Sequence, residues 1–119
     1  MVEIFAVIRR YRLAATRYEL QRAGVAGYSF FSAFGRGRQR GLKSTNGMDG
    51  GHGFLPRMIF YLVTEADRAS VAVEAIIRAN QTGEFGDGRI FVTRLESAMR
   101  ITEKVSAATV HEASCAGVC

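Results

Sequence analysis

Runs of hydrophobic residues separated by polar ones predict the regular elements in the first half of the chain. A short apolar run over residues 3–8 fits a buried strand. Apolar residues recur at helical spacing over residues 13–23, and Gly24 follows them as a helix stop. Aromatic residues cluster over residues 28–34, which favours a second strand.

The second half repeats this alternation of elements. Residues 57–63 form the clearest apolar run and predict a strand. Asp67 is a suitable N-cap for a helix over residues 69–80, and residues 89–93 predict another strand. Residues 96–101 are expected to form a short helical turn that leads into an edge strand. The order β-α-β-β-α-β predicts an α+β, ferredoxin-like sandwich with both helices on one face of an antiparallel sheet.

The face of the sheet without helices is expected to be apolar. We place Phe30, Phe60 and Phe91 there. Exposed apolar patches of that size usually mark association. The chain is therefore expected to form an oligomer.

Two glycine-rich stretches interrupt the predicted elements. Residues 35–53 contain seven glycines and no aliphatic run, which indicates a functional or a disordered loop. Residues 83–88 contain three glycines, and Arg89 follows them. Backbone N–H groups in such a turn form an anion-binding concavity, and a neighbouring arginine adds positive charge. The pattern fits a phosphate cradle, although a tight helix-to-strand turn needs glycines too.

Composition and charge narrow the class of protein. The chain has 119 residues, 48% hydrophobic and 23% charged, as expected for one soluble globular domain. Residues 1–57 hold ten Arg and Lys against three Asp and Glu, which suggests an anionic ligand or partner. Five arginines near the first predicted helix are nevertheless expected to form a solvated basic face: Arg9, Arg10, Arg12, Arg17 and Arg22.

Several functions lack residues to support them. The sequence has no Ser/His/Asp set and no paired acids, so we expect a protein that is not an enzyme. No apolar run approaches the roughly 18 residues of a membrane span, and the apolar start is too short for a secretory leader. A cytoplasmic location is therefore expected.

Three segments together resemble the PII nitrogen-regulatory signalling proteins. They are Gly-Arg-Gly-Arg-Gln-Arg-Gly at 35–41, Leu-Pro-Arg at 55–57 and Thr-Gly-Glu-Phe-Gly-Asp-Gly-Arg-Ile-Phe-Val at 82–92. The resemblance covers about residues 3–101, and the first segment is most similar to the branch that regulates nitrogenase. It implies a homotrimer that binds ATP or ADP in clefts between subunits. It also implies 2-oxoglutarate beside Mg-ATP at the base of a long mobile loop, the T-loop.

The T-loop corresponds to about residues 36–54, between the second and third predicted strands. In the family this loop binds or releases a target protein. The resemblance implies nitrogenase, a synthetase or an ammonium transporter as the target, the last through peripheral contact with a membrane protein. Residues 36–54 contain no tyrosine, which excludes control by uridylylation.

The resemblance assigns site residues position by position. Nucleotide binding is implied for Val7, Ser29, Gly35, Arg36, Gly37, Arg38, Val63, Gly86, Asp87, Gly88, Arg89 and Arg100. Binding of 2-oxoglutarate and Mg²⁺ is implied for Gln39, Arg57 and Gly86. Asp87 is expected either near the ribose or orienting the turn. Arg57 stands where the family has a lysine that pairs with a carboxylate, and arginine can do so with two hydrogen bonds.

Residues 1–101 are therefore expected to form the PII-like domain, and residues 102–119 a flexible tail. His111, Cys115 and Cys119 are spaced so that a helix would place them on one face. They could form a partial zinc or nickel site or a redox-sensitive disulfide, or the two cysteines could have no such role.

Two other functions remain open. One is a PII-like regulator of carbon metabolism that responds to adenylate, bicarbonate, redox state or a metal. The other is an RNA-binding module of the same topology, which the basic first half would suit. Against it, residues 58–62 lack the aromatic motif of RNA-recognition domains. We therefore expect no nucleic-acid partner.

Overall fold

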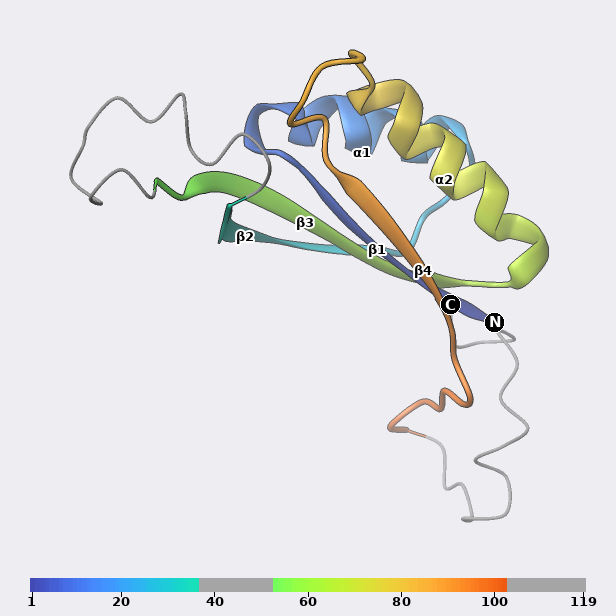
Figure 1. Cartoon of the computed structure of the whole chain (residues 1–119). Coiled ribbons are helices and arrows are strands. Elements are labelled where there is room, and N and C mark those ends of the chain that lie inside the picture. Colours follow the sequence, from blue (N-terminus) through green and yellow to red (C-terminus); the bar gives the residue numbers. More distant parts are fainter. Residues whose placement is uncertain (37–52, 103–119) are drawn as a thin grey trace.

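The protein is a two-layer sandwich with one antiparallel sheet and two helices on the same face of it (Figure 1). The computed structural model describes residues 1–36 and 53–102. Its elements in chain order are β1 (Val2–Arg9), η1 (Arg10–Arg12), α1 (Leu13–Arg22), β2 (Ser29–Gly35), β3 (Leu55–Thr64), α2 (Ala66–Asn80) and β4 (Arg89–Arg94). The sheet order is β2-β3-β1-β4, and every neighbouring pair is antiparallel. The predicted α+β, ferredoxin-like fold is confirmed.

The core lies between the sheet and the helices. Alternate residues of β1 are buried, and Ile4, Ala6 and Ile8 face the helices opposite three buried residues of β3. Leu20 from α1 and Ile76 from α2 close the core from above. Burying an aliphatic side chain of this size contributes about 1.5–3 kcal/mol. This core therefore holds β1 and α2 in place. Both elements carry residues of the site described below at their ends.

The end of α1 is set by glycine, as predicted. Gly24 has φ 77°, its N–H donates to the Gln21 carbonyl (3.0 Å), and the Val25 N–H donates to the Leu20 carbonyl (2.9 Å). This is a Schellman C-cap, in which glycine takes the left-handed conformation at least cost.

A buried hydrogen bond ties the two helices together where α2 ends. The Asn80 amide donates to the Thr16 hydroxyl on α1 (2.9 Å) and to the Ile76 carbonyl (2.8 Å). Asn80 is the last residue of α2, so this contact also fixes the start of the glycine turn that follows.

Two local predictions were wrong. The helix α2 begins at Ala66 after Glu65, and no side chain caps it; Asp67 lies inside its first turn. There the Asp67 carboxylate still stabilises α2 because it lies near the positive end of the helix dipole.

Residues 96–101 form no helical turn. Met99 and Ile101 are exposed, so a turn there would have no packing to stabilise it.

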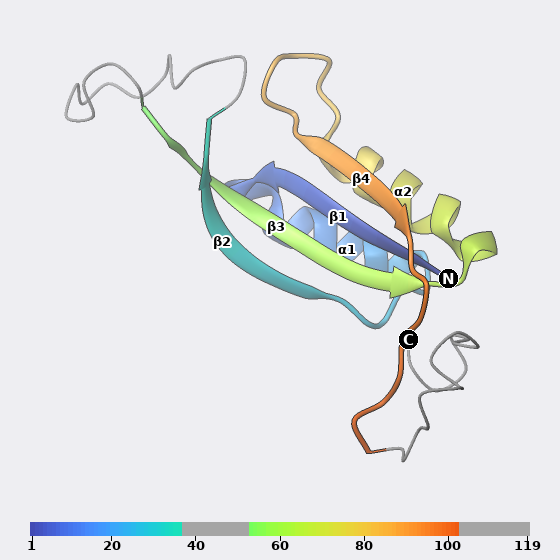
Figure 2. The same ribbon diagram turned by 60° about the horizontal axis from the view of Figure 1, so that its bottom comes forward.

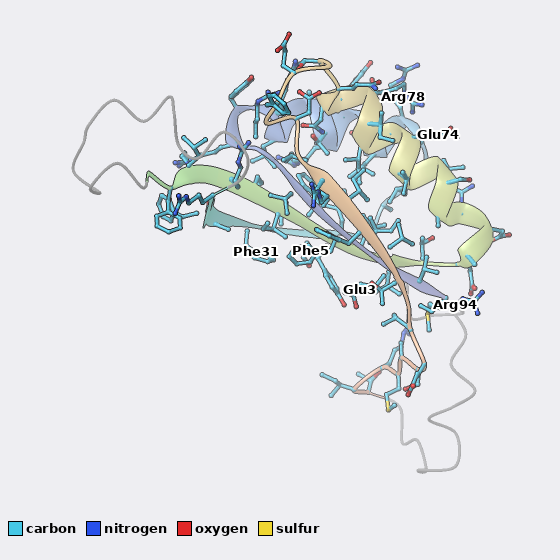
Figure 3. All side chains as sticks on the ribbon, in the orientation of Figure 1. Glu3, Phe5, Phe31, Glu74, Arg78 and Arg94 are labelled. Atoms are coloured by element: carbon cyan, nitrogen blue, oxygen red, sulfur yellow. The ribbon has the colours of Figure 1, made fainter. Side chains whose placement is uncertain are left out.

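The face of the sheet away from the helices is rich in aromatic side chains. Phe5 and Phe31 project from this face (Figure 3). Phe5 packs against Phe91 with ring centroids 6.4 Å apart, and both Phe31 and Phe91 are about half exposed. We call this surface, with Phe5, Phe31, Tyr61 and Phe91, the open face.

The predicted composition of the open face was correct for Phe91 and wrong for Phe30 and Phe60. Phe60 is fully buried on the helix side, and Phe30 pairs with it across the β2–β3 ladder with ring centroids 5.7 Å apart. The reason is the strand period of two: a shift of one residue moves a side chain to the opposite face.

No helix within residues 1–36 and 53–102 is long and apolar enough to cross a membrane.

Candidate functional site

The turn between α2 and β4 adopts a conformation that requires glycine. Gly83, Gly86 and Gly88 all have positive φ, at 86°, 97° and 117°. A Cβ atom on Gly88 would lie 2.0 Å from the Val7 carbonyl oxygen of β1. The glycine turn, residues 81–88, is therefore pressed against the central part of the sheet at Gly88.

Asp87 organises the glycine turn from within. Its carboxylate accepts hydrogen bonds from the N–H groups of Thr82 (2.8 Å) and Gly83 (2.9 Å) and from the Thr82 hydroxyl. The bonds from Thr82, and then those from Arg9 and Gly83, hold the pKa of Asp87 well below its usual range and outweigh the opposing effect of burial. These contacts orient the turn, and the expected position of Asp87 near the ribose stays a prediction.

Arg9 connects the glycine turn to β1. Its guanidinium donates to Asp87 Oδ1 (2.8 Å) and to the Phe85 carbonyl (3.1 Å). The Arg9 side chain is only 16% exposed, so its assignment to a solvated basic face was wrong. Strand alternation could have corrected this, because Arg9 is two residues beyond Val7 and lies on the same face.

Arg57 holds the next residue of the turn. It is opposite Arg9 in the β1–β3 ladder and donates to the Gly86 carbonyl (3.0 Å). Partial burial, followed by the charge of Arg9, lowers the pKa of Arg57. Within the described part of the chain, Arg57 forms no ion pair with a carboxylate. It is thus a partly desolvated cation to which an anion can bind.

Gly35 and Arg36, which begin the first glycine-rich stretch, lie near the glycine turn at one end of the sheet. Figure 2 shows β2 ending and β3 beginning at the same end as the turn between α2 and β4. A hollow of about 830 Å³ opens there, large enough for a nucleotide. It is lined by Val7, Gly35, Arg36, Arg57, Glu84, Phe85, Gly86, Asp87, Gly88, Arg89 and Phe91. We call it the arginine hollow.

The arginine hollow gathers eight of the residues expected at the site: Val7, Gly35, Arg36, Arg57, Gly86, Asp87, Gly88 and Arg89. Ser29 and Val63 lie on the open face outside the hollow, and Arg100 is exposed beyond β4. The remaining expected residues lie outside the described part of the chain: Gly37, Arg38, Gln39, His111, Cys115 and Cys119. Most of the T-loop prediction and nearly all of the predicted tail also lie outside it.

A second hollow of about 550 Å³ lies between α2 and β4, on the other side of the same turn. Its walls are mostly valine and isoleucine. Because three arginines line the first hollow and only Arg89 lines the second, the arginine hollow is the better anion site.

The fold and the arginine hollow define a ferredoxin-like domain suited to bind a phosphate or carboxylate ligand. A family model described as Nitrogen regulatory protein P-II matches residues 1–105. The chain belongs to this family, as its glycine- and arginine-rich segments indicated.

Individual relatives agree with the family match. The chain is 34% identical over 116 residues to the nitrogen fixation nifHD region GlnB-like protein 2 of Methanobacterium ivanovii, covering 89% of this chain and 95% of that protein. It is 38% identical over 102 residues to the nitrogen regulatory protein P-II of Mesorhizobium japonicum, covering 85% and 91%. It is 31% identical over 120 residues to a nifHD region protein of Methanococcus maripaludis, covering 91% and 99%.

Proposed function

We propose that this P-II protein is a homotrimer that binds ATP or ADP, with Mg²⁺ and 2-oxoglutarate, in clefts between its subunits. Ligand binding changes the state of residues 36–54, the expected T-loop, and so controls a nitrogen-metabolism target. The arginine hollow is the observation that carries this proposal, because the glycine turn, Arg36 and Arg57 converge there. The names of the nifHD-region relatives favour a target connected with nitrogen fixation.

Different residues of the arginine hollow bind different ligand groups. The glycine turn and Arg89 bind phosphate groups through backbone N–H groups and a guanidinium. Arg57 binds the carboxylate of 2-oxoglutarate, which competes with the Gly86 carbonyl for its guanidinium.

Mg²⁺ fits such a site because it is commonly held by substrate phosphates together with few protein oxygens. Gln39, the residue expected to help hold it, lies outside the described residues. The metal would offset negative charge on the phosphates, and the arginines would hold their positions.

The open face supports the proposed trimer. Phe31 and Phe91 are half exposed in the single chain, and a neighbouring subunit would cover them. A cleft between subunits also accounts for the positions of Ser29, Val63 and Arg100, which lie outside the hollow of one chain. In the trimer these residues would complete the site of the same or an adjacent subunit.

Calorimetry on the purified protein tests the proposal. Titrations with ATP, ADP and AMP, each with and without Mg²⁺ and 2-oxoglutarate, should show that Mg-ATP raises the affinity for 2-oxoglutarate and the reverse. Reciprocal coupling of about 1–3 kcal/mol is expected for two linked ligands. Absence of adenine-nucleotide binding would refute the proposal. Binding of AMP or bicarbonate without any response to 2-oxoglutarate would support a regulator of carbon metabolism instead.

A matched pair of variants locates the binding site. Arg89→Ala should weaken ATP binding by about 1–3 kcal/mol, the contribution of a charged hydrogen bond. Arg94→Ala, at the other end of β4 and outside the hollow, is the control and should bind ATP as the unmodified protein does. Equal ATP affinity for both variants would place the nucleotide elsewhere.

A further inference from the structure

Arg9 does not line the arginine hollow, yet it is bonded to the turn that forms the floor of the hollow. We propose that Arg9 is a positioning residue for the phosphate-binding turn and that it acts through Asp87. This inference rests on the proposed nucleotide site and extends it to a residue behind that site.

Arg9 anchors the turn to a strand that is held on both sides. β1 is paired on both sides, with β3 and with β4, so Arg9 projects from a strand held by two ladders. The hydrogen bonds of Thr82 and Gly83 to Asp87 stay within the turn. Arg9 supplies the ion pair that ties Asp87, and with it those two N–H groups, to the sheet.

Arg9 and Arg57 both contact the turn but differ in their access to a ligand. Arg57 also holds the turn, through the Gly86 carbonyl, but it lines the hollow and is open to a ligand carboxylate. A carboxylate on Arg57 competes with that carbonyl. Arg9 does not line the hollow, so a ligand bound there would leave its contacts with Asp87 and Phe85 in place.

Arg9 also changes the charge that a phosphate would meet in the hollow. Asp87 lines the hollow, and a carboxylate without a counter-charge there would repel phosphate. The Arg9 guanidinium, 2.8 Å from Asp87 Oδ1, offsets that negative charge. Loss of Arg9 should therefore harm binding more as the number of phosphates rises from AMP to ATP.

A double-mutant cycle tests the proposal. ATP and AMP affinities are measured by calorimetry for Arg9→Met, Asp87→Asn and the double variant. Arg9→Met should weaken ATP about tenfold, the loss of about one charge-assisted bond, and should weaken AMP less. The double variant should lose no more affinity than Asp87→Asn alone, because Arg9 acts through that carboxylate.

Two further variants separate positioning from general damage. Arg9→Lys keeps the charge and should recover part of the ATP affinity. Arg10→Met removes a neighbouring exposed cation and should leave affinity unchanged. If Arg9→Met does not fold, Arg9→Lys replaces it in the cycle, and its loss of ATP affinity must then vanish in the Asp87→Asn background.

The possible results discriminate clearly. Unchanged ATP affinity in Arg9→Met, or losses that add in the double variant, would overturn the role of Arg9 while leaving the nucleotide site intact. Failure of the unmodified protein to bind ATP would instead refute the proposed function on which this inference rests.

Discussion

At the scale of single residues, Asp87 has the largest structural role in the site. It accepts two backbone N–H bonds, a hydroxyl bond and a guanidinium bond. A carboxylate with this many donors is strongly favoured in its ionised form. The turn therefore depends on the ionisation of one side chain.

This dependence predicts how stability changes with pH. The folded-state pKa of Asp87 lies below its ordinary value of 3.8, so its contribution to stability is present above that value. The contribution is lost as the pH falls through 3.8 toward the lower folded-state pKa. Urea midpoints measured between pH 7 and pH 2 should show the unmodified protein more stable than Asp87→Asn at neutral pH, with the difference shrinking below about pH 4. A difference that stays constant down to pH 2 would contradict this account.

The sequence predicted the types of the site residues better than their partners. The glycine turn, Arg57 and Arg89 were expected at the site, and the structure brings them together in one hollow. Arg9 was missed because a charged residue at the end of a strand resembles an ordinary surface cation. Only the pairing of β1 with β3 and β4 shows that its side chain lies against Asp87.

At the scale of elements, the strands and helices were predicted close to their observed positions. Strong apolar runs fix an element regardless of its neighbours, as for β1 and β3. The face of each residue was harder to predict because it depends on register, and Phe30 and Phe60 were placed on the wrong side. The short segment 96–101 failed for a related reason, since its apolar residues Met99 and Ile101 are exposed.

The glycine turn offers a matched test at this scale. Gly83→Ala and Gly88→Ala both place a Cβ in a positive-φ conformation, which costs about 1–2 kcal/mol. At Gly83 the added atom meets open space, whereas at Gly88 it collides with the Val7 carbonyl. Gly88→Ala should therefore lower the free energy of unfolding by about 2–5 kcal/mol in chemical denaturation, clearly more than Gly83→Ala. Equal effects would mean that the turn can move away from β1 at little cost.

At the scale of the whole molecule, the two faces of the sheet differ sharply. One face is covered by α1 and α2, and the other presents Phe5 and Phe31 (Figure 3). Phe91 packs against Phe5 on that same face. Exposed apolar side chains gathered on one face in this way are typical of an association surface. The proposed trimer would bury it.

A charge placed on the open face should prevent assembly. Phe5→Glu would put a carboxylate in the middle of the proposed interface, on a central strand. Light scattering coupled to gel filtration should give three times 13.0 kDa for the unmodified protein and a smaller mass for this variant. Tyr18→Glu, at an exposed position of α1 on the helix side, is the control and should remain trimeric. A monomeric unmodified protein would contradict the assembly.

The pairing of Arg9 with Arg57 across the β1–β3 ladder has a practical consequence. The two guanidinium groups lie at the same end of the sheet, and Asp87 forms an ion pair with that of Arg9. Small oxyanions such as sulfate or inorganic phosphate should bind to the guanidinium of Arg57. Protein purified in phosphate buffer would then melt at a higher temperature and bind nucleotide more weakly than the same protein in a zwitterionic buffer. The choice of buffer thus becomes part of any measurement of its affinity.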